Sequence, residues 1–271
     1  MAVPGLTERM SYEKYAALEG ARYSHIKRFK WSAAHARQDI LHPRDPTPAL
    51  SLGHAVHAAV LEPQLFMDEF VAAPKCDKRT KVGKATWREF QGDNAFKEII
   101  TDVEFETCIR FSNACWAHPT AKEILSGVGQ NEVVARWTQD GTPAKARYDR
   151  ITSLASWSIV ADLKTTQDAR EWAFSADIAQ YGYHNQAAWY LDGLDAISPH
   201  PRKWVFIVLE KSPPWAIQCY MLDDIALEQG RDENRVYLRA YAECLKTGKW
   251  PSYPAGLKSI SIPPYALQVM D

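Results

Sequence analysis

Asp162 and Lys164 are the residues whose types and spacing are best suited to chemistry. They lie in the segment 158–164, an apolar run typical of a buried central strand. Because side chains alternate along a strand, both project from one face, with Leu163 on the other. A buried carboxylate is costly unless a cation, hydrogen-bond donors or a metal offsets its charge. The pair therefore indicates either a metal-dependent catalytic site or a buried Asp–Lys ion pair that supports the sheet.

Asp149 supplies a second carboxylate, thirteen residues before Asp162 and on the strand predicted at 145–151. Two carboxylates that converge on one point describe a hard-cation site, where Mg²⁺ takes one or two carboxylates together with waters and a substrate phosphate. The backbone carbonyl of Leu163 lies between the two side chains of its strand and is a candidate further ligand. Beside such a metal, the Lys164 ammonium can orient or deprotonate a water, or stabilise charge on a phosphate.

The elements that must position these residues follow from periodicity and turn signals. Helices are predicted at 52–61, which ends near Pro63, and at 84–100 and 103–117, the latter interrupted by Pro119. Strands are predicted at 132–137, 145–151, 158–164, 204–210 and 216–221, with a hairpin turn at 139–142. A helical region at roughly 168–195 and an amphipathic helix at 224–246, ended by Gly248 and Pro251, complete the chain. This order predicts one α/β domain over 1–271, with a mainly helical region at 1–128, a sheet-containing core at 129–250 and a tail at 251–271.

The pattern Asp149-x₁₂-Asp162-x-Lys164 resembles the PD-(D/E)XK nuclease superfamily. More specifically, the chain resembles the exonuclease VIII (RecE-type) branch of phage recombination exonucleases, which is related to lambda-type exonuclease. The stretches that carry the resemblance are the helix 52–57, the basic segment 73–83, the core motifs 145–151 and 160–166, and a Q-x-x-x-Y element at 186–190, and together they span about residues 20–250. The resemblance implies an α/β fold with a restriction-endonuclease-like core, in which helices flank a central mixed β-sheet and an N-terminal helical region precedes it.

The resemblance also implies roles for individual residues. Asp149, Asp162, the Leu163 carbonyl and His57 would be metal ligands, with Asp162 standing where lambda-type enzymes carry Glu. Lys164 would be the catalytic lysine. His54, one turn from His57, is an alternative ligand, and a hydrogen-bonded core histidine is the alternative reading of His57.

Three further residues are implied to belong to this site. Glu132 would complete the acidic cluster, although an ordinary carboxylate at a strand start is the alternative. Gln186 and Tyr190 lie at positions i and i+4 of a predicted helix and so share one face. The resemblance implies that they contact DNA or support the lysine, and the alternative is simple helix packing.

The charge of the chain is unevenly distributed. Its 32 Lys and Arg against 33 Asp and Glu give a net charge of −1, which argues against a uniformly basic nucleic-acid-binding surface. Segments 22–44 and 75–88, however, each sum to +5, so that the remaining residues sum to −11. Such runs are either solvated faces or segments that contact phosphates. The candidate DNA-binding residues are Ser24, Lys27, Arg28, Lys78, Arg79, Lys81 and Arg147.

Several classes of protein are excluded by missing signals. The five cysteines contain no C-x-x-C pair, which argues against a zinc ribbon or an iron–sulfur cluster, and Cys108 and Cys115 are expected to be buried thiols on one helix. There is no P-loop, G-x-G-x-x-G or G-x-S-x-G motif. No apolar run reaches the length of a membrane span, so a cytoplasmic protein without membrane attachment is expected.

The function implied by the resemblance is a Mg²⁺-dependent 5′→3′ exonuclease, with Mn²⁺ as a substitute. It would degrade one strand of linear double-stranded DNA to mononucleotides and leave 3′ single-stranded tails for a single-strand annealing protein or recombinase. Relatives form rings, so a homo-oligomer of three or four subunits is expected. The missing cysteine cluster and P-loop disfavour a CRISPR-associated or AddB-like nuclease. A site- or structure-specific endonuclease and a catalytically inactive DNA-binding protein are the alternatives, and the joint presence of Asp149, Asp162 and Lys164 disfavours the inactive protein.

Overall fold

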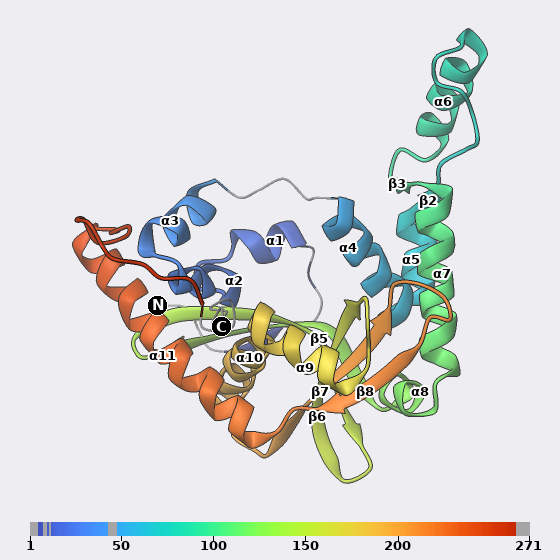
Figure 1. Cartoon of the computed structure of the whole chain (residues 1–271). Helices are drawn as coiled ribbons and strands as arrows, with labels where there is room; N and C mark the ends of the chain where they lie inside the picture. The colour runs from blue at the N-terminus through green and yellow to red at the C-terminus, as the bar shows by residue number, and fades with distance from the viewer. Residues whose placement is uncertain (1–4, 8–9, 11, 43–47, 264–271) are drawn as a thin grey trace, which may run out of the picture.

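The computed structural model of the chain describes residues 5–7, 10, 12–42 and 48–263. Its main sheet has six strands in the order β1-β4-β5-β6-β7-β8 (Figure 1). These strands are β1 (Gly5–Thr7), β4 (Gly129–Gln139), β5 (Thr142–Leu154), β6 (Trp157–Thr166), β7 (Arg202–Glu210) and β8 (Ile217–Met221). Neighbours are antiparallel except β6 and β7, which pair in parallel. The predicted α/β fold with a central mixed sheet is therefore confirmed.

Helices pack on both faces of this sheet. One face is covered by α2 (Tyr23–Ile26), α9 (Glu171–Tyr181), α10 (Tyr183–Ile197) and α11 (Asp224–Thr247). The other is covered by α4 (Pro48–Leu61), α5 (Pro63–Glu69), α7 (Asp102–Ala117) and α8 (Pro119–Ser126). Of the remaining helices, α1 (Tyr12–Ala17) precedes α2, while η1 (Lys27–Lys30) and α3 (Ala33–Leu41) contact α11. Among the described residues, no helix is both long and apolar enough to cross a membrane.

Strand β6 shows how the sequence builds a core on each face. Val160 belongs to the core beneath α10 and α11, whereas Ala161 and Leu163 belong to the core beneath α4, α7 and α8. A strand that is buried on both faces requires such a nearly continuous apolar run. Asp162 interrupts the run and is only 3% exposed. By alternation it lies on the Val160 face, so its charge is enclosed within the molecule.

Local signals account for the boundaries that the sequence predicts well. At the hairpin between β4 and β5, Asp140 and Gly141 have φ values of 48° and 79°, and a two-residue turn with positive φ at both positions suits the twist of paired strands. Helix α7 starts with a reciprocal capping box between Thr101 and Glu104. Helix α11 ends at Gly248, which is left-handed. Cys108 and Cys115 are free thiols buried in α7, as expected.

One helical prediction is wrong in part. The segment predicted as helix 84–100 overlaps α6 (Lys81–Asp93) over 84–93, but Glu98–Ile100 is strand β3. Asn94 ends α6, and β3 pairs in parallel with β2 (Phe70–Ala72), a distant partner that local periodicity does not reveal. The helical region predicted at 168–195 is confirmed and consists of two helices that meet at Gly182, which has φ 69°. Strand β1, within the region expected to be mainly helical, extends the main sheet through β4.

Residues 70–100, here called the arm, comprise β2, the loop that follows, α6 and β3. Figure 1 shows α6 standing away from the main sheet, beyond β2 and β3. The loop folds against the first turn of α6, where the Gly83 N–H donates to the Thr80 hydroxyl at 2.9 Å. A Cβ on Gly83 would lie 1.9 Å from the Asp77 carbonyl oxygen, so this contact requires glycine.

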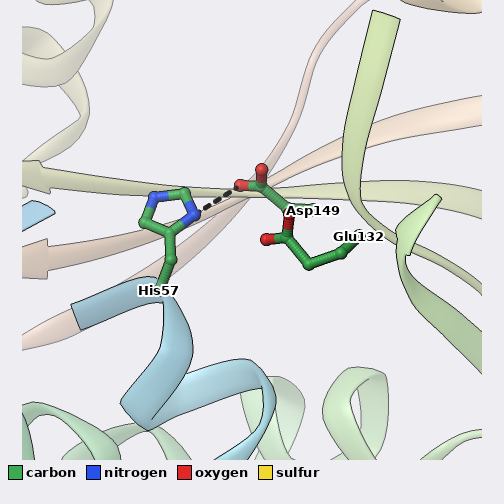
Figure 2. A group of neighbouring side chains, drawn as sticks. All are labelled: His57, Glu132 and Asp149. Atoms are coloured by element: carbon green, nitrogen blue, oxygen red, sulfur yellow. Dashed lines mark ion pairs between the residues drawn. The ribbon is translucent and has the colours of Figure 1, made fainter. Parts of the chain in front are cut away.

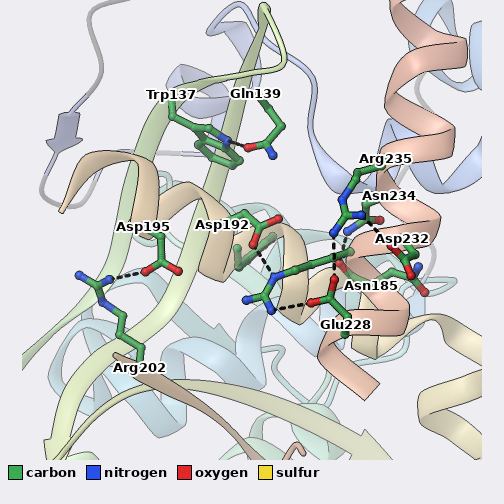
Figure 3. A network of polar contacts seen from close by, with 12 residues as sticks. Trp137, Gln139, Asn185, Asp192, Asp195, Arg202, Glu228, Asp232, Asn234 and Arg235 are labelled. Carbon is green, nitrogen blue, oxygen red and sulfur yellow. Dashed lines mark hydrogen bonds and ion pairs between the residues drawn. The ribbon is translucent and has the colours of Figure 1, made fainter. Parts of the chain in front are cut away.

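Polar contacts fix α10 against α11 (Figure 3). Arg231 Nε donates to Asp192 Oδ1 at 2.8 Å, and Asn234 Nδ2 donates to the Asn185 carbonyl at 2.7 Å. The helices approach closely at Gly230, where a Cβ would lie 2.5 Å from the His184 carbonyl oxygen. This interface determines where α10 places the side chains that face the sheet.

Candidate active site

Strands β5 and β6, which carry Asp149 and Asp162, separate at the candidate site. The ladder between β5 and β6 ends at the pair Arg150–Ala161, one position before Asp149 and Asp162 would face each other. Beyond it, the Leu163 N–H donates to Asp149 Oδ2 at 2.8 Å, so a carboxylate takes the place of a backbone carbonyl. The N–H and C=O of one residue in a strand point to the same edge. The Leu163 carbonyl therefore also faces β5, as required of the ligand predicted there.

Strands β4 and β5 both change faces at this point. On β5, Tyr148 lies in the core beneath α10, yet the Arg150 guanidinium donates to the Ile124 carbonyl on the opposite face. Regular alternation would place Tyr148 and Arg150 on one face, so it is broken at Asp149. On β4, directly opposite, Glu132 has φ 53°. A left-handed conformation costs a non-glycine residue about 1–2 kcal/mol. The distortion brings the two carboxylates to one locale.

His57, Glu132 and Asp149 form a cluster in which one potential ligand atom of each lies within 4.8 Å of the others. Figure 2 shows His57 reaching from α4 toward the two carboxylates of the sheet, and its Nδ1 lies 3.4 Å from Asp149 Oδ2. One imidazole and two carboxylates, with a backbone carbonyl nearby, are a donor set that fits a divalent cation such as Mg²⁺ or Mn²⁺. Glu132 also pairs with Arg147, whose Nε lies 3.0 Å from Glu132 Oε2.

Asp162 and Lys164 form a buried ion pair, and Gln186 Nε2 donates to the other Asp162 oxygen at 3.2 Å. Burial raises the pKa of Asp162 to about 6; the Lys164 ammonium opposes this shift and the Asp149 carboxylate reinforces it. Burial lowers the pKa of Lys164, but attraction to Asp162 and Asp149 outweighs burial and the pKa lies above its usual value. Lys164 is thus a cation at neutral pH, suited to stabilising negative charge rather than to removing a proton.

A cleft of about 370 Å³ lies beside this site, although Glu132, Asp162 and Lys164 are not among the residues that line it. Its lining includes Asp149, His57 and Gln186 from the predicted site. Tyr190 also lines the cleft, with its ring packed edge-on against Tyr148. The cleft therefore brings Asp149, His57, Gln186 and Tyr190 together in one place.

Only some of the predicted DNA-binding residues line the cleft. Ser24, Lys27 and Arg147 do. Arg28 instead pairs with Asp39 beside Trp31. The residues predicted at 78–81 belong to the arm, where Lys78 lies over the Trp87 ring, Arg79 pairs with Asp77 and Lys81 begins α6. The two basic segments thus occupy separate places, and the second does not line the cleft within the part of the chain that the structure describes.

Comparison with known proteins identifies the family. The family described as "PDDEXK-like domain of unknown function (DUF3799)" matches residues 23–260. The chain belongs to this family. This finding confirms the superfamily predicted from the spacing of Asp149, Asp162 and Lys164. No match was found among curated proteins.

Solved structures resemble this PDDEXK-like domain in fold. One, described as "Putative exonuclease" from Eubacterium rectale, has 13% sequence identity and a TM-score of 0.60, with 94% of this chain and 97% of that chain covered. Protein VC1899 from Vibrio cholerae has 8% identity over 84% of this chain and 57% of that chain, at a TM-score of 0.24. The first structure shares the fold over nearly the whole of both chains. The TM-score of the second is too low to support any conclusion.

Sequence reasoning missed several residues of the PDDEXK-like site. Tyr15, Arg22, Tyr23, Tyr181 and Tyr183 all line the cleft. Arg22 lies in the basic segment that the sequence singled out, so that charge run was its signal. The tyrosines carry no comparable signal, because aromatic residues in helices are usually core residues. His54 lines the cleft as well, but the structure places His57 rather than His54 in the carboxylate cluster.

Proposed function

We propose that this PDDEXK-like domain is a divalent-metal-dependent exodeoxyribonuclease that degrades one strand of linear double-stranded DNA from its 5′ end. The observation that supports catalysis is that His57 and Asp149 of the carboxylate cluster line one cleft together with Gln186, which donates a hydrogen bond to Asp162 of the Asp162–Lys164 pair. The 5′→3′ polarity, the mononucleotide products and the 3′ single-stranded tail rest on the resemblance of the sequence motifs to the exonuclease VIII branch.

Each residue has a distinct part in the proposed hydrolysis. Asp149, Asp162, the Leu163 carbonyl and His57 would hold Mg²⁺ or Mn²⁺, with Glu132 beside them. The bound ion would polarise the scissile phosphate and lower the pKa of a water. The Lys164 ammonium would stabilise the negative charge that develops on the phosphate oxygens. Gln186 would hold the Asp162 carboxylate in place through the hydrogen bond to Oδ1.

The predicted DNA-binding residues would contact the substrate at two different points. In the proposed enzyme, Ser24, Lys27 and Arg147 contact the DNA end or its 5′-phosphate inside the cleft that they line. Lys78, Arg79 and Lys81 belong to the arm and would contact the duplex beyond the cleft. A ring-shaped homo-oligomer and a single-strand annealing partner accompany this proposal, on the resemblance alone.

The proposal is tested with linear 5′-phosphorylated duplex and with covalently closed circular DNA, each incubated with Mg²⁺. The expected result is degradation of the linear form only, with loss of activity in EDTA and in Asp162→Ala. Cutting of closed circles would instead favour a site- or structure-specific endonuclease. Equal activity of Asp162→Ala and the unchanged protein would show that the site lies elsewhere. Inactivity of the unchanged protein with Mg²⁺, and again with Mn²⁺ in its place, would favour a DNA-binding role.

A further inference from the structure

Tyr181 and Tyr183 flank the junction of α9 and α10 and lie where two hollows of the surface meet. Both residues line the catalytic cleft. Both also line a neighbouring cavity of about 220 Å³, whose other walls include Thr165, Asp168 and Lys211. A nucleic-acid strand that left the cleft in this direction would pass over the two rings.

The backbone that carries the two rings is held firmly. Gly182, between them, has φ 69°, and a Cβ there would lie 2.5 Å from the Tyr23 hydroxyl oxygen. That hydroxyl donates to the Gly182 carbonyl at 2.6 Å. The ring centroids of Tyr181 and Tyr183 are 5.6 Å apart, with the planes inclined by 34°. The pair is therefore presented at a fixed kink rather than on a loose loop.

The two rings differ in what surrounds them. Tyr183 packs against Phe174 and Phe206, and the Lys164 ammonium lies 4.8 Å from its ring centroid, a distance typical of a cation–π contact. Tyr181 is 50% exposed, which leaves much of its ring open to a ligand. The Tyr183 ring thus contacts the proposed catalytic lysine, while the Tyr181 ring is accessible to a ligand.

We propose that Tyr181 and Tyr183 form a stacking platform for an unpaired nucleobase of the strand being cut. The proposal rests on the proposed nuclease function. Every nucleobase has a π-face, so such a platform accepts any sequence, and base–aromatic stacking is the usual way in which proteins bind single-stranded nucleic acid without sequence preference. Because Tyr183 contacts Lys164, a base on this platform sets the position of its own phosphate relative to that lysine. Tyr183 is accordingly a positioning residue.

The test removes the base instead of the protein side chain. A series of linear duplexes carries a tetrahydrofuran abasic residue at each of the first positions from the 5′ end, and single-turnover cleavage is measured with Mg²⁺. At one position the loss of the base should slow cleavage by about 5- to 150-fold, the range expected for one stacked base. Tyr181→Ala should slow cleavage of intact DNA by a comparable factor and show no further loss at that position, while Tyr181→Phe should retain the normal rate.

The matched control is Trp172→Ala, which removes an aromatic side chain that is 66% exposed on the same helix α9. It should behave as the unchanged protein at every abasic position. Equal effects at all positions, or a Tyr181→Ala rate equal to that of the unchanged protein on intact DNA, would overturn the platform while leaving the nuclease function standing.

A binding measurement separates failure of the platform from failure of the nuclease function. A single-stranded oligonucleotide with 2-aminopurine near its 5′ end is titrated with protein in Ca²⁺. Stacking on tyrosine should quench the fluorescence in the unchanged protein and in Trp172→Ala, but not in Tyr181→Ala. If the unchanged protein cleaves no DNA at all, the nuclease proposal fails, and this difference in quenching still decides whether the platform exists. Equal quenching in all three proteins would overturn it.

Discussion

At the scale of single residues, Asp162 and Lys164 place opposite charges in an interior where either charge alone would be costly. Asp162 is 3% exposed and the Lys164 side chain 14% exposed, so each charge depends on the other. Removing one partner of a buried pair leaves an uncompensated charge, which usually costs about 3–5 kcal/mol of the free energy of unfolding. A buried ion pair was one of the two readings that the D-x-K spacing allowed. The structure shows that pair inside the proposed catalytic site, so the two readings are compatible.

Lys164→Met is expected to reduce the cleavage rate by about 10²–10³-fold, the usual cost of losing one preorganised group that stabilises transition-state charge. DNA affinity measured in Ca²⁺ should change little, because the duplex is held mainly by other contacts. Lys203→Met is the matched control, since Lys203 lies on β7 and pairs with Asp224 on the surface.

The folding of this variant needs its own check, because Asp162 loses its partner. The double variant Asp162→Asn, Lys164→Met removes both charges and should recover most of the lost stability in a urea melt, but no activity. Recovery of activity together with stability would contradict the proposed roles of both residues, since Asp162 is a proposed metal ligand.

The pH dependence of cleavage should follow Asp162. Its pKa rises on folding from 3.8 to about 6 because of burial, so the folded state binds a proton more readily than the unfolded state. Without metal, protonation of Asp162 therefore adds to the free energy of unfolding. This contribution is fully present below pH 3.8 and is lost as the pH rises through about 6. A metal ion needs the ionised carboxylate, so activity should rise over the same interval.

Metal and proton compete for that carboxylate. Rate–pH profiles at low and high Mg²⁺ should therefore differ, with the acid-side midpoint displaced to lower pH at high Mg²⁺. A midpoint that stays fixed over a hundred-fold range of Mg²⁺ would contradict the assignment of Asp162 as a ligand.

At the scale of elements, the arm contributes no residue to the lining of the cleft. Lys81, Lys84 and Arg88 are exposed and lie at positions i, i+3 and i+7 of α6, so they share one face of that helix. The loop before α6 is held in place by the Gly83 contact. A positively charged face on a projecting helix suits a contact with duplex DNA outside the cleft.

Replacing Lys81, Lys84 and Arg88 with alanine should weaken duplex binding and flatten its salt dependence. Each phosphate contact that is lost should lower the slope of log K against log salt concentration by about 0.9. The comparison is a triple variant of exposed lysines elsewhere, Lys122, Lys246 and Lys258, which should keep the normal slope. Equal slopes in the two triple variants would assign the arm another role.

At the scale of the whole molecule, what the sequence predicts is what local interactions determine. Strands β4 and β5, the turn between them and α11 follow from alternation, a positive-φ dipeptide and helix caps. The proximity of Asp149 to Asp162 follows from the antiparallel pairing of β5 with β6. Pairings between distant segments, such as β1 with β4, leave no local trace. The change of face at Glu132 is likewise hidden, because glutamate gives no sign of a left-handed backbone. The contact of Tyr183 with Lys164 depends on how α10 packs on the sheet, which local sequence does not reveal.

The reach of His57 from α4 to the carboxylates of the sheet has a consequence for local opening of the fold. An ion held by both elements would act as a removable cross-link, because α4 could not lift away without releasing it. At a free ion concentration a hundred times its Kd, such opening becomes about 2.7 kcal/mol harder. Amide hydrogens near the end of α4 should then exchange roughly 100-fold more slowly, while those of α11, on the opposite face, should exchange as before. Mass spectrometry of deuterium uptake with and without Mg²⁺ measures both helices in one experiment, and equal slowing in α4 and α11 would show that the ion does not join α4 to the sheet.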